Sequence, residues 1–436
     1  MGVLLVITTL ITCLFAAKRP WAAAALLIVL LPLEQVLQGY FVFLRYGSAS
    51  SLVNVVIGVV ALISWLHSRL VAPTSTTLLQ CKVLLISAAL LAWSFVTCAW
   101  SPSSENALDI ITKGFPYYVA VVVVGSQLIS TLPDLRRCLY LVLLLGILIN
   151  VSFLLNPEFT FRDGRLGFDF GGGYRSSSLA IGESGAIAMI IAVVMREADS
   201  KRFLWLVRSA GALLGAVVLI MSGARGQLIA GALVSAAFYP LATSQRNIQR
   251  TIWSICLITL FLVAGWFIFE SVLSMLPTFA STRFSSQEIL YGASSASGRI
   301  GNVNALFSAW LQSPLAPFVG LGYLAFGSVT GGSALEEYCH NVYAEVIFEL
   351  GIPGVVCMAG AIYMGMKSAI RLYKSSTLEP SNLTTAAMIL ALIVYEAILL
   401  AKQGSLWGSY MFFFYLCTAD RIQRENETNL VNGIQA

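Results

Sequence analysis

Long apolar runs separated by short polar segments fill most of the chain, and this pattern is typical of a membrane protein with many spans. A helix that crosses the hydrocarbon core of a bilayer needs about 20 mostly apolar residues. By that measure we expect about 13 spans, within a range of 12 to 14. They fall at residues 3–17, 20–37, 51–66, 78–98, 115–131, 138–154, 178–195, 204–222, 226–243, 252–272, 342–366, 384–401 and 405–419. The predicted fold class is all-α, a polytopic bundle of membrane helices.

One long polar stretch, residues 273–340, interrupts the apolar runs. Basic residues fall in alternate loops, and the positive-inside rule places those loops in the cytoplasm. The polar stretch then lies on the opposite, periplasmic side. We expect one integral membrane domain with four parts, which are N-terminal membrane helices (1–272), a large periplasmic segment (273–340), C-terminal membrane helices (341–420) and a frayed cytoplasmic tail (421–436).

Composition supports a membrane protein and excludes several other classes. Only 11% of the residues are charged and 58% are hydrophobic, whereas a soluble domain carries about 25% charged residues. The net charge of +5 is spread over short loops, so nucleic acid is not an expected partner. The eight cysteines form no CxxC pair, and the sequence has no Gly-rich nucleotide loop. We therefore expect no metal site and no cofactor.

Arg225 is the first candidate for chemistry, because it lies in a tight turn, Ser222-Gly223-Ala224-Arg225-Gly226, between two predicted spans. A guanidinium group offers a planar fork of donors that suits phosphoryl oxygens. Two interpretations stay open from the residues alone. Arg225 either reaches lipid phosphates at the membrane surface or binds a phosphate that belongs to a substrate.

His340 is the second candidate, because it closes the polar stretch just before an apolar helix that carries Glu345. A neutral histidine there can accept a proton from a hydroxyl, although a lone histidine is also commonly a hydrogen-bonded structural residue. The sequence Gly351-Ile352-Pro353-Gly354 predicts a break in this helix. A short helix at 342–350 would then present His340 and Glu345 to a cavity.

The ordered motifs resemble the O-antigen ligase and O-antigen polymerase superfamily, which includes exopolysaccharide polymerases. They are the SGARG turn, Ser297-Gly298-Arg299, Pro314 followed after five residues by Gly320-Leu321-Gly322-Tyr323, and a His340-Asn341 pair before Glu349-Leu350-Gly351. The resemblance implies a bundle of about a dozen membrane helices with one large periplasmic segment. It also implies transfer of a glycan from undecaprenyl pyrophosphate to an acceptor hydroxyl, without metal or nucleotide.

Carried onto this sequence, the resemblance makes Arg225 and Arg299 the pyrophosphate-binding residues and His340 the catalytic base. The resulting mechanism is an inverting glycosyl transfer. Second-tier candidates are Tyr343 and Glu345 for orienting His340 or the sugar, Asn341 beside the histidine, and Arg283 for binding glycan or phosphate.

Polymerisation of O-antigen or exopolysaccharide repeat units is the favoured activity, because the motifs look like the general polysaccharide polymerase type. The first alternative is a ligase that attaches the glycan to lipid A core. The second is a transporter or flippase, which would require charged groups along a path through the bilayer. The expected location is the bacterial inner membrane, with the active site facing the periplasm. Expected partners are the lipid-linked donor, a lipid-linked or lipid A core acceptor and membrane lipids, and the sequence leaves open a chain-length regulator.

Overall fold

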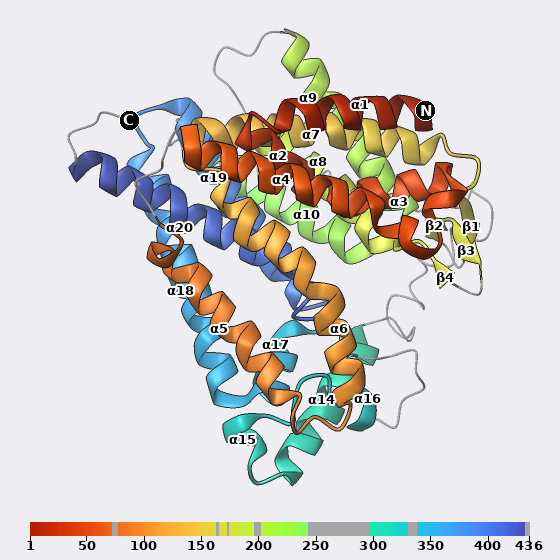
Figure 1. Cartoon of the computed structure of the whole chain (residues 1–436), viewed down its shortest axis with the longest axis vertical. Coiled ribbons are helices and arrows are strands. Elements are labelled where there is room, and N and C mark those ends of the chain that lie inside the picture. The colour runs from red at the N-terminus through yellow and green to blue at the C-terminus, as the bar shows by residue number, and fades with distance from the viewer. Residues whose placement is uncertain are drawn as a thin grey trace. The chain divides into compact units, whose positions relative to one another are not determined.

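The computed structural model describes residues 1–71, 77–162, 165–171, 174–195, 202–242, 296–329 and 338–431. These residues are helical apart from two short β-hairpins, so the predicted all-α membrane fold is confirmed (Figure 1). The expected span at 252–272 and the candidate Arg283 lie outside the described residues.

The chain forms two compact units, each built from three separate stretches of sequence. The first comprises Met1–Pro73, Leu128–Ser285 and Leu372–Tyr395, and the second Thr74–Gln127, Ser286–Arg371 and Glu396–Ala436. Two long helices run from one unit into the other, α18 (Leu350–Ser375) and α19 (Pro380–Leu400). Each unit is described by itself below.

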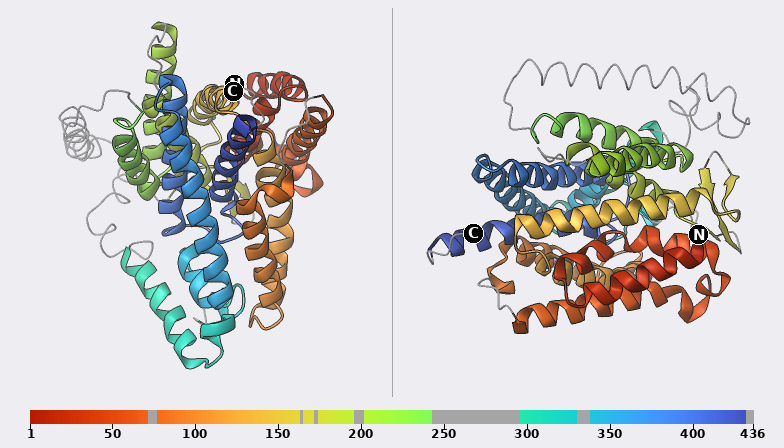
Figure 2. Two further views of the ribbon diagram at one scale, coloured as in Figure 1. Left: turned by 90° about the vertical axis from the view of Figure 1, so that its left-hand side faces the viewer. Right: turned by 90° about the horizontal axis from the view of Figure 1, so that it is seen from above.

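The first unit consists of membrane helices and two short β-hairpins, which lie between α7 and α8 in the chain. Its described helices are α1 (Gly2–Ala16), α2 (Pro20–Ile28), α3 (Leu30–Tyr40), η1 (Val42–Leu44), η2 (Gly47–Ser51), α4 (Leu52–Val71), α7 (Leu132–Leu154), α8 (Ser178–Val194), α9 (Arg202–Met221) and α10 (Arg225–Phe238). The predicted span at 20–37 is broken, because α2 and α3 meet at an angle of 64°. After α7, β1 (Thr160–Arg162) pairs antiparallel with β2 (Arg165–Gly167), and β3 (Asp169–Gly171) with β4 (Tyr174–Arg175) (Figure 2).

Helices α8 and α9 pack through glycines at a distance that admits no side chain between them. A Cβ atom on Gly215 of α9 would lie 2.4 Å from the carbonyl oxygen of Gly185 on α8, and one on Gly185 would lie 2.8 Å from that of Gly215. Gly211, one turn before Gly215, allows the same approach to α7, because a Cβ atom there would lie 2.5 Å from Leu143. Small residues four apart allow such close approach of helices in a bilayer. Arg208 then donates to the carbonyl oxygens of Ala192 and Val193 at the end of α8, at 2.8 and 3.3 Å. This packing positions α10, which begins with Arg225.

The second unit contains segments from before, within and after the polar stretch. Its described elements are η3 (Leu78–Gln80), α5 (Lys82–Thr97), α6 (Ser104–Tyr117), η4 (Tyr118–Gly125), α14 (Ala296–Gln312), α15 (Ala316–Val319), α16 (Phe326–Val329), α17 (Val342–Ala344), η6 (Glu345–Glu349), most of α18 and α20 (Tyr410–Val431). Segments η4 and η6 are π-helical, and η6 lies directly after the His340 motif.

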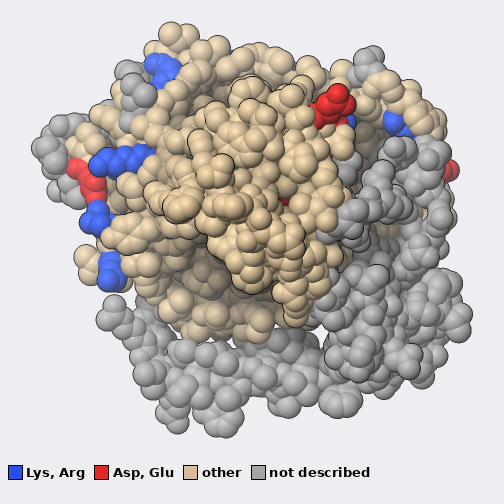
Figure 3. Space-filling view, turned by 90° about the horizontal axis from the view of Figure 1, so that it is seen from below, with Lys and Arg blue, Asp and Glu red and all other residues tan. Residues whose placement is uncertain are grey.

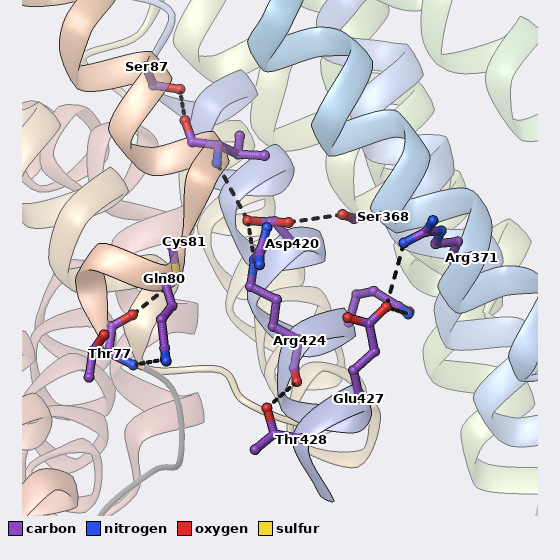
Figure 4. Close-up of polar contacts among 12 residues, drawn as sticks. Thr77, Gln80, Cys81, Ser87, Ser368, Arg371, Asp420, Arg424, Glu427 and Thr428 are labelled. Atoms are coloured by element: carbon purple, nitrogen blue, oxygen red, sulfur yellow. Dashed lines mark hydrogen bonds and ion pairs between the residues drawn. The ribbon is translucent and has the colours of Figure 1, made fainter. Parts of the chain in front are cut away.

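A buried carboxylate joins three helices of the second unit. Asp420 on α20 accepts from the Val83 backbone N–H on α5 at 3.5 Å and from the Ser368 hydroxyl on α18 at 3.0 Å (Figure 4). Arg424, one turn further along α20, donates to the same carboxylate at 3.0 Å. Arg421 is also buried and donates to Gln127. These contacts therefore hold α20 in place against α5 and α18.

The observed helices follow the predicted spans, with two differences in extent. Most predicted spans within the described residues overlap a helix, but the span at 20–37 divides into two helices, and residues 405–409 of the span at 405–419 precede α20. Six described helical segments are long and apolar enough to cross a membrane, or seven if α2 and α3 are counted as one span. One span begins earlier than expected, since α6 and η4 run continuously from Ser104 to Gly125. The predicted fraying after Arg421 is wrong, because α20 continues to Val431. In both α6 and α20, pairs of opposite charges four residues apart, such as Asp109 with Lys113, stabilise helical segments whose sequence is too polar to be predicted as a span.

The described surface fits a lipid environment. One face is almost without charge, and the Lys, Arg, Asp and Glu side chains visible on it lie mainly at its margins (Figure 3). Large apolar side chains are exposed on the helices, for example Leu14 on α1 and Leu213 on α9. Exposed apolar surface of this extent is characteristic of membrane contact.

Candidate active site

His340 occupies a turn whose geometry is unusual for its residue type. Its φ angle is 56°, in the left-handed region, and its ring lies 4.5 Å from that of Tyr338, centroid to centroid. Asn341 then caps the following helix, since its side chain accepts from the Ala344 backbone N–H at 3.1 Å. Cys339, on the other side, is fully buried. The histidine is therefore half-buried between two fixed neighbours.

The predicted break in the helix after His340 is confirmed at Gly351, which has φ 62° and ψ −159° inside α18. Pro353 has no N–H, so the carbonyl of Glu349, four residues earlier, lacks its helical donor. The Gly322 backbone N–H donates to that carbonyl instead, at 3.0 Å. A buried backbone acceptor in a membrane protein requires such a substitute.

The neighbouring carbonyls of the break are satisfied in the same way. The Leu321 backbone N–H donates to the carbonyl of Phe348 at 2.9 Å, and the indole N–H of Trp93 donates to that of Leu350 at 2.8 Å. Two motifs that are separate in sequence thus form one structure: the Gly-Leu-Gly-Tyr loop supplies the donors that the broken helix lacks.

Two glycines allow this loop to reach the break. A Cβ atom on Gly320 would lie 2.0 Å from the carbonyl oxygen of Glu349, and one on Gly351 would lie 2.5 Å from the Gly320 nitrogen. No larger residue fits at either position without moving backbone. The loop is anchored at its far end to α5, because Ser101 donates to the carbonyl of Tyr323 at 2.6 Å and Tyr323 N–H donates to Thr97 at 3.2 Å.

The second-tier candidates on the helix have partners other than His340. Tyr343 donates through its hydroxyl to the carbonyl of Ala397 at 3.0 Å. Glu345 is buried and accepts from the Leu406 backbone N–H at 2.9 Å. Asn341 is the helix cap described above. The roles of these residues toward a sugar stay predictions, and their observed contacts connect the His340 segment to the connection between α19 and α20.

Helix α14, which carries Arg299 in its first turn, packs against the His340 segment. Leu306 of α14 forms a buried cluster with Phe326, Cys339 and Ala344. The rings of Phe307 and Trp310 pack against that of Phe348 in tilted and edge-to-face arrangements, with centroids 5.7 and 5.6 Å away. The structure describes the backbone of Arg299, and its side chain lies outside the described part. The arginine helix and the histidine turn therefore share one core in the second unit.

Arg225 lies in the first unit, as the first residue of α10, after a turn with Gly223 at φ 66°. It is half-buried, whereas Ser222 and Ala224 beside it are buried. No side chain caps the N-terminal end of α10, and the Gln227 side chain donates to the carbonyl of Leu179 on α8 at 3.0 Å. Backbone N–H groups at a helix N-terminus favour an anion. The convergence of Arg225 with Arg299 and His340 stays a prediction.

Cys339 directly precedes His340, but its thiol is not suited to act as a nucleophile. Burial raises the pKa of its thiol, and the nearby carboxyls of Glu345 and Glu349 add to this effect. A thiol with a raised pKa stays protonated and unreactive. Among the described residues no group of three or more His, Cys, Asp or Glu side chains is arranged to hold a metal ion.

Sequence reasoning missed the residues that build the turn around the histidine. Trp93 and Ser101 come from α5 and the turn after it, more than 200 residues before the motif, and nothing local marks them. Glu349 was named only as part of the motif that follows His340-Asn341. Its signal is a carboxylate in an otherwise apolar helix next to a Gly-x-Pro-Gly break, where freed backbone groups require partners.

Residues 210–359 match the family model described as O-antigen ligase. The matched region begins before the SGARG turn and ends after Gly354, so it contains every candidate site residue named from the sequence. Comparison with curated proteins gives no match. The match confirms the resemblance inferred from the motifs.

Proposed function

We propose that this chain polymerises lipid-linked repeat units, because residues 210–359 match the family model described as O-antigen ligase. The donor is a glycan on undecaprenyl pyrophosphate, and the acceptor is a hydroxyl of a second lipid-linked glycan. The reaction inverts the anomeric centre and uses no metal. The arrangement that carries this proposal is His340 in a fixed left-handed turn, packed against the helix of Arg299.

In the proposed reaction His340 takes the proton of the acceptor hydroxyl. The hydroxyl oxygen attacks the anomeric carbon of the donor, and the bond from that carbon to the pyrophosphate oxygen breaks. The electron pair of that bond remains on the departing undecaprenyl pyrophosphate. A base must stay within hydrogen-bond distance of the proton it accepts, and the fixed neighbours of His340 support that requirement.

Arg225 and Arg299 are proposed to hold the pyrophosphate and to stabilise the charge that grows on it as it departs. Support for Arg225 comes from the uncapped N-terminal end of α10, whose backbone N–H groups add to the positive potential. Support for Arg299 comes from the packing of α14 against the histidine turn. The polyprenyl tail lies in the bilayer, and the site faces the periplasm of a bacterial inner membrane.

Ligation to lipid A core is the second candidate activity, because the matched family model is described as O-antigen ligase. The two activities share the donor and differ in the acceptor. Purified protein in lipid vesicles should therefore be given the lipid-linked glycan extracted from the source cells, either alone or with lipid A core. Longer lipid-linked chains identify a polymerase, and glycan attached to lipid A core identifies a ligase.

Replacement of His340 tests the proposed base. His340→Ala should lower transfer by about a hundredfold or more, since general bases contribute about 10²–10⁴-fold. His67→Ala is the matched control, because His67 on α4 is the other histidine of the chain. Transfer is measured per amount of protein in the membrane. Full transfer by the His340 variant would remove the base from the mechanism.

A further inference from the structure

Two described residues other than glycine have a left-handed backbone, Leu324 at φ 61° and His340 at φ 56°. This region is unfavourable for residues with a side chain, and above all for a bulky one such as leucine. Such conformations persist only where the surroundings hold them, and they gather at functional sites. A specific contact is therefore required to keep Leu324 in its turn.

Glu349 supplies that contact. One oxygen of its carboxylate, Oε2, accepts from the Leu324 backbone N–H at 2.8 Å, and the other, Oε1, accepts from the Phe326 backbone N–H at 3.1 Å. The side chain has no exposed surface. Both oxygens are thus committed to the turn that follows the Gly-Leu-Gly-Tyr loop, and neither is available to solvent.

The turn held by Glu349 bears directly on the histidine. Phe326 packs in one buried cluster with Cys339 and Ala344. Cys339 immediately precedes His340, and Ala344 is the residue whose N–H the Asn341 cap holds. The cluster therefore packs against the chain on both sides of His340 and fixes its path.

We propose that Glu349 is a positioning residue for His340, acting through Phe326 and the Cys339–Ala344 cluster. This inference rests on the proposed function, in which His340 is the base. Loss of one hydrogen-bonding oxygen at position 349 releases the turn at Leu324. The imidazole of His340 then moves away from the hydroxyl group of the acceptor glycan.

Glu34 on α3, in the first unit, provides a control outside the proposed site. It is also buried, and its Oε1 accepts hydrogen bonds from the side chains of Gln38 at 3.3 Å and Asn54 at 2.9 Å. A glutamine at 34 can place its amide oxygen at the position of Oε1 and keep both bonds. A glutamine at 349 must place its NH₂ group against a backbone N–H, so one of the two bonds is lost.

Kinetics in vesicles test the proposal with the lipid-linked glycan extracted from the source cells. Glu349→Gln should lower kcat by about ten- to a hundredfold, because a misplacement of about 1 Å in a catalytic group has that effect. The donor KM should stay within about twofold. Glu34→Gln should keep wild-type kcat. Glu349→Asp, which retains two acceptor oxygens, should be more active than Glu349→Gln; packing alone predicts the reverse order, because glutamine has the shape of glutamate.

A second readout does not depend on transfer. The chain has two histidines, so His67→Gln leaves His340 as the only imidazole for ¹⁵N-histidine NMR in nanodiscs. Adding Glu349→Gln should shift or broaden the His340 signal, and adding Glu34→Gln should leave it unchanged. If His340→Ala remains active while the signal still depends on Glu349, the proposed base is wrong and the positioning contact is right.

Wild-type kcat and an unchanged His340 signal in Glu349→Gln would overturn the proposal. If neither Glu349 variant accumulates in membranes, Phe326→Leu replaces them. That change shrinks the contact between the turn and Cys339, and it should lower kcat with an unaltered donor KM. Unchanged kcat in this variant would equally rule out the positioning path.

Discussion

At the scale of single residues, the site combines a strained backbone with specific hydrogen bonds. His340 lies in a left-handed turn, its neighbour Asn341 caps a helix, and the carboxylate of Glu349 uses both oxygens. Such a turn costs about 1–3 kcal/mol by itself. Several specific contacts are needed to offset that cost, so the histidine has little freedom to move.

The arginines are open to a test of the same kind. Lysine at 225 or 299 keeps the charge but loses the planar fork of donors. Loss of one charge-assisted hydrogen bond costs about 1.5–3 kcal/mol, so kcat/KM for the lipid-linked donor should fall by about ten- to a hundredfold. Arg137→Lys is the control, since Arg137 is exposed on α7 and pairs with Asp134. Wild-type kcat/KM in both test variants would contradict pyrophosphate binding.

The sequence identified residues of the site where their type dictates their role. The sequence marked Asn341 as a candidate beside the histidine, and the structure shows that it caps the following helix, a position that asparagine strongly favours. The role of Glu349 could not be predicted, because the backbone N–H groups that donate to it belong to a loop 23 to 25 residues away. No periodic pattern encodes that path.

At the scale of elements, the broken helix and the Gly-Leu-Gly-Tyr loop are one unit. The break releases backbone acceptors, and the loop approaches closely enough to satisfy them only because Gly320 and Gly351 have no side chains. Hydropathy predicted the helix, and Gly-x-Pro-Gly predicted the break. Neither pattern could predict which segment would supply the hydrogen-bond donors, since the loop precedes the break by about 30 residues in sequence and contacts it only in the folded chain.

Alanine substitutions in α18 test the close approach. Gly351→Ala places a Cβ atom 2.5 Å from the Gly320 nitrogen in a left-handed backbone, so it should destabilise the protein by about 1–3 kcal/mol or more. Gly360→Ala on the same helix meets Ile86 at an ordinary 3.6 Å and should be neutral or slightly stabilising. Thermal unfolding of the purified protein in detergent measures both. Equal unfolding temperatures for the two variants would refute the steric argument.

At the scale of the whole molecule, the chain is divided between two units that each draw on three stretches of sequence. The spans themselves were predictable, because about 20 apolar residues are needed to cross the bilayer. The grouping of the helices into two units could not be predicted, because it depends on contacts such as the hydrogen bond from the Ser101 hydroxyl to the carbonyl of Tyr323. The extents of α6 and α20 were underestimated since paired charges allow polar sequence to remain helical.

Cysteine labelling tests the predicted orientation. Tyr46 lies in a loop predicted to be periplasmic, and Leu378 lies in one predicted to be cytoplasmic; their exposed fractions are 56% and 96%. In spheroplasts, a maleimide that cannot cross membranes should modify Tyr46→Cys at once and Leu378→Cys only after permeabilisation. The parent chain, whose native cysteines are mostly buried, gives the background. The opposite pattern would invert the topology and place the polar stretch in the cytoplasm.

The bond between the indole of Trp93 and the carbonyl of Leu350 spans 257 residues, and it has a consequence for biogenesis. The ribosome releases α5 into the bilayer long before it translates the segment that α5 anchors. During that interval the nascent chain holds a polar indole without its eventual acceptor. Assembly of the half that contains the histidine must therefore wait for almost the entire polypeptide, and chains terminated before residue 350 are the natural substrates of membrane quality control.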